Sequence, residues 1–128
     1  MSMTKLGRML GLFLVFAPGA ALAQATLDLT VPYGNAAGCK VVKGEAEPGE
    51  DALIVRPDRF ESASSTCEIV QVLPAKDNVR VVMALCQLED EEGRGVNLFS
   101  ISPDKADPGA LVIRDEYGAS WDEVRPCQ

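Results

Sequence analysis

The densest group of ionisable side chains is the segment EDEEGRG at 89–95, where four acids from Glu89 to Glu92 precede two glycines. Carboxylate oxygens are the ligands that Ca²⁺ prefers, so a calcium loop is one interpretation of this segment. The spacing does not match the alternating acids of such a loop, and consecutive acids at a strand end point to opposite sides. We therefore expect a solvated hairpin tip, and we predict no metal ion and no cofactor.

Further carboxylates towards the C-terminus could supply the acid pair of a glycoside hydrolase: Asp104, Asp107, Asp115, Glu116, Asp122 and Glu123. That chemistry requires two carboxyl groups across a cleft, at about 5–5.5 Å or about 6.5–9.5 Å. Nothing in the sequence selects a pair, so we expect these acids in turns and on the surface. The chain also has no histidine, which removes the commonest general base and the usual Ser-His and Cys-His nucleophiles. We therefore predict that the protein is not an enzyme and has no catalytic residues.

Two features are candidates for binding a partner protein. The segment RPDRF places Arg56, Arg59 and Phe60 together in an otherwise acidic chain, and Trp121 is the only tryptophan. Arginine and aromatic residues are enriched at interface hot spots. Each feature has a structural alternative, which we favour: Phe60 pins a loop whose arginines pair with nearby acids, and Trp121 packs in the core beside a terminal disulfide.

Two of the four cysteines lie at the ends of a predicted hairpin, TCEIVQVLPAKDNVRVVMALC at 66–86. A turn centred between Lys76 and Asp77 places Cys67 directly opposite Cys86, at a separation that a disulfide can bridge.

The same register pairs Val72 with Val81 and Val70 with Met83. It also sets Glu68 opposite Leu85 and Arg80 opposite Leu73, so polar and apolar residues do not alternate cleanly across the pair. A bulge or a slip of one residue would change this pairing register.

Cys39 and Cys127 then remain, and their disulfide would close most of the chain into one loop. Four cysteines permit three pairings, of which Cys39–Cys67 with Cys86–Cys127 is the next alternative. Four free thiols are atypical of a small exported domain. We expect all four cysteines to be structural.

The first residues have the pattern of a secretory signal peptide over 1–23. Lys5 and Arg8 precede an apolar run that is short for a membrane span, and ALA at 21–23 predicts cleavage there, leaving a single domain over 24–128. The net charge is −7, and loss of the two leader cations would make it −9. Such an acidic chain is unsuited to nucleic acid and better suited to a cationic partner.

The remaining apolar runs are short and are bounded by Gly, Pro, Asn or Asp, which is typical of strands joined by turns. The predicted strands lie at 25–31, 39–43, 52–56, in the hairpin, and at 96–102, 110–115 and 119–127, with a polar loop at 56–65 and a turn at 33–35. No window predicts a helix of ordinary length. The expected fold is all-β, a small antiparallel barrel or sandwich of six to eight short strands with two disulfides.

At YGNAAGC (33–39), SSTC (64–67), the cysteine at 86 and GASWDEVRPC (118–127), the chain resembles a group of small exported four-cysteine proteins of alphaproteobacteria. The resemblance covers most of the domain and implies a periplasmic location, but it implies little about activity. Periplasmic lysozyme inhibitors are similar in size and compartment, yet their serine- and tyrosine-containing glycine motifs have no counterpart here.

These observations favour a non-enzymatic binding module of the periplasm or the secreted fraction, acting as an inhibitor or by contact with an envelope or host protein. The alternative is a carrier that holds a small apolar ligand inside a barrel.

Overall fold

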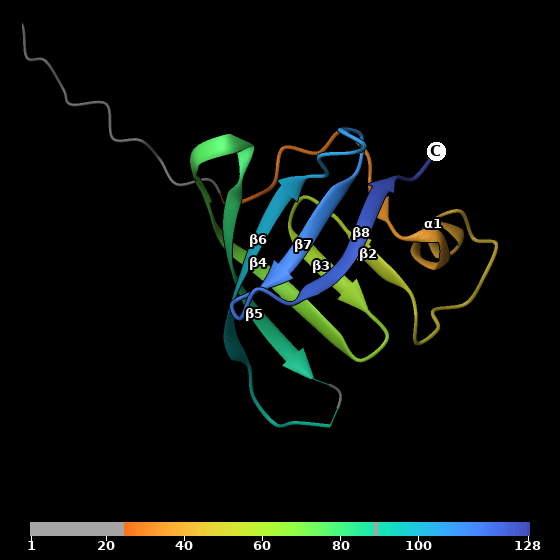
Figure 1. Cartoon of the computed structure of the whole chain (residues 1–128). Coiled ribbons are helices and arrows are strands. Elements are labelled where there is room, and N and C mark those ends of the chain that lie inside the picture. The colour runs from red at the N-terminus through yellow and green to blue at the C-terminus, as the bar shows by residue number, and fades with distance from the viewer. Residues whose placement is uncertain (1–24, 89) are drawn as a thin grey trace, which may run out of the picture.

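The computed structural model describes residues 25–88 and 90–128. Eight strands close into a barrel in sequence order, and β8 returns to pair with β1, every pair being antiparallel (Figure 1). The elements are β1 (Tyr33–Gly34), α1 (Ala36–Val42), β2 (Leu53–Val55), β3 (Arg59–Ser62), β4 (Ser65–Pro74), η1 (Lys76–Asn78), β5 (Arg80–Leu88), β6 (Gly95–Pro103), β7 (Leu111–Asp115) and β8 (Ser120–Pro126). The all-β prediction is confirmed, and the closed sheet decides for a barrel over a sandwich.

Both predicted disulfides are present, Cys39–Cys127 and Cys67–Cys86, and no cysteine of the described chain is free. Two disulfides in a small domain indicate an oxidising environment outside the cytoplasm. The predicted signal peptide over 1–23 lies outside the described residues. In the part of the chain that the structure describes, no helix is long and apolar enough to cross a membrane.

Four local predictions were wrong. The segment 25–31 is irregular rather than a strand, the strand predicted at 39–43 is largely the helix α1, the turn at 33–35 contains β1, and the loop at 56–65 contains β3. Each of these segments is short, so its conformation depends on partners far away in the sequence more than on its own pattern. The seven-residue helix spans about two turns, too short to show a 3.6-residue periodicity.

The β4–β5 hairpin follows the predicted register only on its cysteine side. Cys67 faces Cys86 and Glu68 faces Leu85, as predicted, but a bulge at Val70 shifts every later pair by one residue. Gln71 therefore pairs with Met83.

Beyond the bulge, Val72 pairs with Val82 rather than Val81, and Arg80 pairs with Pro74 rather than Leu73. The extra residue lets both Ile69 and Val72 face the interior, which the unshifted register does not allow.

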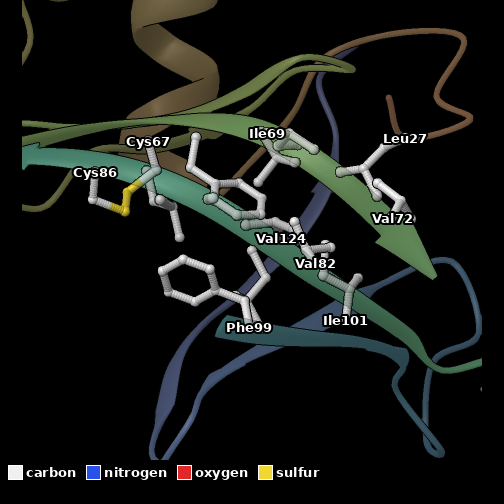
Figure 2. Packing of buried hydrophobic residues seen from close by; sticks show 14 residues of the cluster. Leu27, Cys67, Ile69, Val72, Val82, Cys86, Phe99, Ile101 and Val124 are labelled. Carbon is white, nitrogen blue, oxygen red and sulfur yellow. A yellow bond between two sulfur atoms is a disulfide. The ribbon is translucent and has the colours of Figure 1, made fainter. Parts of the chain in front are cut away.

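The barrel interior is packed with a single cluster of fourteen buried residues. Figure 2 shows buried side chains of β4, β5 and β6, among them Ile69, Val82 and Phe99, together with Val124 of β8. Leu27 precedes the first strand, and its backbone N–H donates to the Pro57 carbonyl at 2.7 Å. Its side chain packs beside Val72 of β4 (Figure 2) and belongs to the same buried cluster.

An ion pair on the surface gives a prediction about acid stability. Arg125 of β8 pairs with Asp107 in the β6–β7 connection. The hydrogen bond from Arg125, followed by one from the Gly109 backbone N–H, holds the pKa of the Asp107 carboxyl below its ordinary value of 3.8. A lowered folded-state pKa contributes stability above the unfolded value, and this contribution is lost as the pH falls through the folded value.

We expect Arg125→Ala to raise the pKa of Asp107 towards 3.8 and to flatten the pH dependence of stability below that value. Carboxyl-detected NMR titration of Asp107 measures the first effect and acid unfolding the second. Arg94→Ala is the control, because Arg94 pairs with Glu68 instead. An unchanged Asp107 titration in Arg125→Ala would contradict the assignment.

Candidate functional site

Asn35 ties together three parts of the chain at the end of the barrel opposite Leu27. Its side-chain oxygen accepts hydrogen bonds from the backbone N–H of Gly38 at 2.7 Å and of Leu53 at 3.0 Å. Its amide nitrogen donates to the Asp51 carbonyl at 2.6 Å and to the Asp122 carboxylate at 2.8 Å. One side chain therefore caps α1, begins β2 and holds Asp122 of β8 in place.

Helix α1 lies against the outside of β1 and β2, at the right of Figure 1. Its Gly38 is buried directly beside β2, and a methyl group there would lie 2.0 Å from the Leu53 carbonyl oxygen. Cys39, the next residue, joins the helix to Cys127 just after β8. The approach of the helix to the sheet therefore depends on glycine, on the cap and on the disulfide together.

Trp121 covers the same end of the barrel from β8. Its ring packs edge-on against Phe99, with centroids 4.6 Å apart, and more distantly against Phe60 at 6.5 Å. The two phenylalanines are 5.2 Å apart and are buried, whereas Trp121 is 38% exposed. Such edge-to-face contacts add to the burial energy, so the core holds the indole in place while part of it faces solvent.

A bulge in β8 brings Trp121 and Asp122 to the same end of the barrel. Ile113 of β7 pairs with Asp122, but the next residue, Arg114, pairs with Ser120, so Trp121 is the extra residue. In a regular strand two consecutive side chains point to opposite faces, and a bulge removes that constraint. Trp121 and Asp122 consequently line one pocket.

This pocket has a volume of about 540 Å³ and lies between the β3–β4 turn, the start of β2 and the start of β8. We call it the Trp121 pocket; it is lined by Asn35, Glu50, Asp51, Ala52, Leu53, Ser62, Ser64, Ser65, Leu88, Trp121 and Asp122. Its volume is in the range of small-molecule sites, and it could equally receive one or two side chains of a protein.

The lining of the pocket is acidic and, among the described residues, includes no Lys or Arg. Glu50, Asp51 and Asp122 contribute carboxylates, of which the first two belong to exposed residues. Ser62 and Ser65 add hydroxyls that lie 3.0 Å apart. Carboxylates, hydroxyl oxygens and an indole together suit an ammonium or guanidinium group, which gains ion pairs, hydrogen bonds and a cation–π contact.

The other predicted partner-binding residues lie outside this pocket. Phe60 is 1% exposed, in the core. Arg56 and Arg59 both donate to the Glu61 carboxylate, and Arg59 also contacts Asp58. The hydrogen bond to Glu61 raises the pKa of Arg59 above its ordinary value. This is the structural alternative that the sequence favoured for these residues, although Arg59 and Phe60 begin β3 and only Arg56 lies in the connection before it.

Trp121 was predicted to pack in the core. One part of its ring does contact the core, but the side chain is also partly exposed at the pocket. Its contacts are with Phe60 and Phe99.

The acidic segment at 89–95 connects β5 to β6, as the hairpin-tip prediction required, and Glu89 is outside the described residues. Over 25–88 and 90–128, no three acidic or cysteine side chains are grouped so as to hold a metal ion. Among the six carboxylates considered for catalysis, Asp122 alone lines the Trp121 pocket.

Sequence reasoning missed most of this pocket. The local pattern predicts a turn at Asn35 and a polar loop at the serines, and it predicts no strand at Glu50 and Asp51. The signal available for Asn35 was its residue type, because Asn is among the preferred helix N-caps, although the helix itself was not predicted. Nothing in the sequence places the serines at 62–65 near Trp121, because that proximity follows from closure of the barrel.

Comparisons with protein-family models, with curated proteins and with solved structures find no match for this chain. The chemistry of the Trp121 pocket is therefore the feature from which a function can be inferred.

Proposed function

We propose that the protein is a non-enzymatic binding module that takes a basic group of a partner protein into the Trp121 pocket. The observation that carries this proposal is the combination, in one open pocket, of an indole fixed by the core with carboxylates and no lining cation. A lysine or arginine side chain on a protruding loop would have its charge matched by Glu50 and Asp51 and its stem covered by Trp121.

The charge of the whole chain supports the same choice of partner. With 19 acidic and 12 basic residues, the protein attracts cationic surfaces from a distance and repels acidic ones. Such steering accelerates encounter, whereas the pocket supplies the specific contact.

The proposed site of action is the periplasm or the medium outside the cell. The two disulfides support an extracytoplasmic location, and the sequence pattern over 1–23 supports export. A partner there would be an envelope protein or a host protein with a basic surface, and blocking its active surface would make the module an inhibitor.

Binding rather than catalysis is proposed because the serines of the pocket have no histidine to activate them anywhere in the chain. The alternative function, carriage of an apolar ligand inside the barrel, would require the packed side chains around Phe99 and Val124 to move apart. The Trp121 pocket needs no such rearrangement.

The single tryptophan provides a direct test, because the only indole of the chain lines the pocket and no other tryptophan contributes to the emission. We expect a short arginine-rich peptide to change the intensity or wavelength of Trp121 emission in a saturable way, and added salt to weaken the binding. A glutamate-rich peptide of equal length should have no effect.

Two double variants that remove the same charge distinguish the contribution of the pocket carboxylates to binding from the effect of the net charge of the chain. Glu50→Gln with Asp51→Asn should weaken binding roughly three- to tenfold, as expected for two partly solvated ion pairs. Asp28→Asn with Asp77→Asn removes the same charge at the other end of the barrel and should leave binding nearly unchanged. Equal losses in the two double variants, or no response to the arginine peptide, would overturn the proposal.

A further inference from the structure

Asp122 differs from the other two carboxylates of the Trp121 pocket because the fold holds it in place. Its Oδ2 accepts a hydrogen bond from the Asn35 amide at 2.8 Å, and its Oδ1 accepts one from the Glu123 backbone N–H at 2.8 Å. A carboxylate has about four acceptor sites, so each oxygen can accept a further hydrogen bond. The other two carboxylates belong to exposed residues, whereas Asp122 is half-buried. Asp122 therefore presents two oxygens to the pocket in an orientation that is set before a ligand arrives.

The orientation of the Asn35 amide is itself determined by its hydrogen bonds. Its oxygen accepts from the backbone N–H groups of Gly38 and Leu53, which an amide nitrogen could not do. The nitrogen must then face Asp122 and the Asp51 carbonyl, and both of its hydrogens are used there. Asn35 consequently acts on a ligand through Asp122, as a positioning residue, because its own donors and acceptors are already satisfied.

The indole of Trp121 is the second rigid element of the pocket. Phe99 packs edge-on against the ring at 4.6 Å, and Trp121 nevertheless remains 38% exposed. The bulge in β8 brings this ring and the Asp122 carboxylate into the same pocket. A planar guanidinium stacks on an aromatic face and donates two parallel hydrogen bonds to a carboxylate, whereas an ammonium is a compact point charge without that fork.

We propose that the Trp121 pocket selects arginine over lysine, with Asp122 as the carboxylate that determines specificity and Asn35 as the residue that positions it. This inference rests on the proposed function, since it names which basic side chain the pocket takes. Glu50 and Asp51, which are exposed, attract either cation by charge alone. The fixed carboxylate of Asp122 favours the side chain whose donors match its two oxygens. The partner is accordingly a protein that presents an arginine on a protruding loop.

Pre-organisation and hydration set the size of the preference. An exposed acid loses rotamer freedom when it binds a ligand, whereas the Asp122 side chain is already ordered by its hydrogen bonds in the free protein. A guanidinium is also more weakly hydrated than an ammonium, so it loses less on entering a half-buried site. We expect an arginine peptide to bind about tenfold more tightly than a lysine peptide of the same charge.

The test compares two short peptides of equal length, with arginines in one and lysines at the same positions in the other, by titration of Trp121 fluorescence. A third peptide carries dimethylated arginines, which keep their charge but cannot form the bidentate hydrogen bonds, so it should bind as the lysine peptide does. Equal affinity for the arginine and lysine peptides overturns this inference and leaves the proposed function standing. Failure of all three peptides to bind overturns both.

Asn35→Asp tests the positioning role. Aspartate is also a preferred N-cap and can accept the hydrogen bonds from Gly38 and Leu53, but it cannot donate one to Asp122. If charge alone governed binding, the added carboxylate would strengthen the binding of both peptides. We expect instead that the ratio of the arginine affinity to the lysine affinity falls from about tenfold to about twofold.

Asp122→Asn leaves the helix cap in place and should reduce the same ratio to about one, because an amide offers a single acceptor oxygen without charge. Glu50→Gln with Asp51→Asn is the matched control, which should weaken both peptides and leave the ratio unchanged. Circular dichroism of each variant checks that the barrel is intact. A ratio that stays unchanged in both Asn35→Asp and Asp122→Asn overturns the proposal.

Discussion

Replacement of Cys39 and Cys127 together by alanine should lower the free energy of unfolding by about 4–5 kcal/mol. The disulfide joins residues separated by 88 positions, and the chain-entropy relation gives about 4.5 kcal/mol for a loop of that length. For a domain whose total stability is about 5–15 kcal/mol, this is a large share. The expected result is a variant that is folded only marginally at 37 °C.

The physical reason is specific to the termini of the barrel. Cys39 lies in α1, and Cys127 follows β8, where its backbone N–H donates to the Pro32 carbonyl at 2.9 Å. β1 has only two residues, so the closing pair between β1 and β8 has few hydrogen bonds of its own. The disulfide therefore holds the seam at which the barrel closes.

Guanidinium denaturation followed by Trp121 fluorescence measures the loss. The variant Cys67→Ala with Cys86→Ala is the comparison, because its separation of 19 corresponds to only about 3 kcal/mol of chain entropy. Both of its cysteines are buried, so lost packing adds to that value. A loss below about 1 kcal/mol for the Cys39/Cys127 variant would show that the seam is held by other contacts.

The second large effect is expected at Gly38, where substitution by alanine should destabilise the protein by about 3 kcal/mol. In an isolated helix the same change would be favourable by about 1 kcal/mol, so the predicted sign is the reverse of helix propensity. The methyl group would lie 2.0 Å from the Leu53 carbonyl oxygen. Neither group can rotate away, because a Cβ is fixed to the helix backbone and the carbonyl belongs to the backbone of β2. Helix α1 would have to move off β2, which strains the cap at Asn35.

Thermal and chemical unfolding of Gly38→Ala test this expectation. Gly49→Ala is the matched control, because a methyl group there meets no atom within 4 Å and the residue is not in the left-handed region. It should be neutral or slightly stabilising. Equal stability of the two variants would mean that α1 can shift without cost, and the Trp121 pocket would then be less rigid than described.

Gly38 and Asn35 show why part of the site could not be derived from the sequence. As a local pattern, YGN reads as a turn, and the roles of Asn35 towards Leu53 and Asp122 exist only after β2 and β8 have come together. The place of Trp121 in the pocket could not be derived from the sequence either, because it depends on a bulge that no residue pattern predicts. Hydrogen bonds between residues 87 positions apart are decided by topology, not by propensity.

The hairpin shows the opposite case. Its two cysteines could be placed face to face because one local turn sets the register between adjacent strands, and that prediction holds for Cys67 and Cys86. It fails beyond Val70, where burial of both Ile69 and Val72 in the shared core is satisfied by an extra residue.

What the sequence by itself determined was the β class, the juxtaposition of Cys67 and Cys86 across the hairpin, and the acidity of the chain. These follow from short apolar runs between turn residues, from local strand geometry and from composition, none of which requires knowledge of distant contacts. Only the tertiary structure decided that the sheet closes into a barrel, that α1 forms beside β2, and that Trp121, Asp122 and the acids before β2 meet in one pocket. Closure joins the first strand to the last, and contacts of that kind are specified by the packing of the whole core rather than by any one segment.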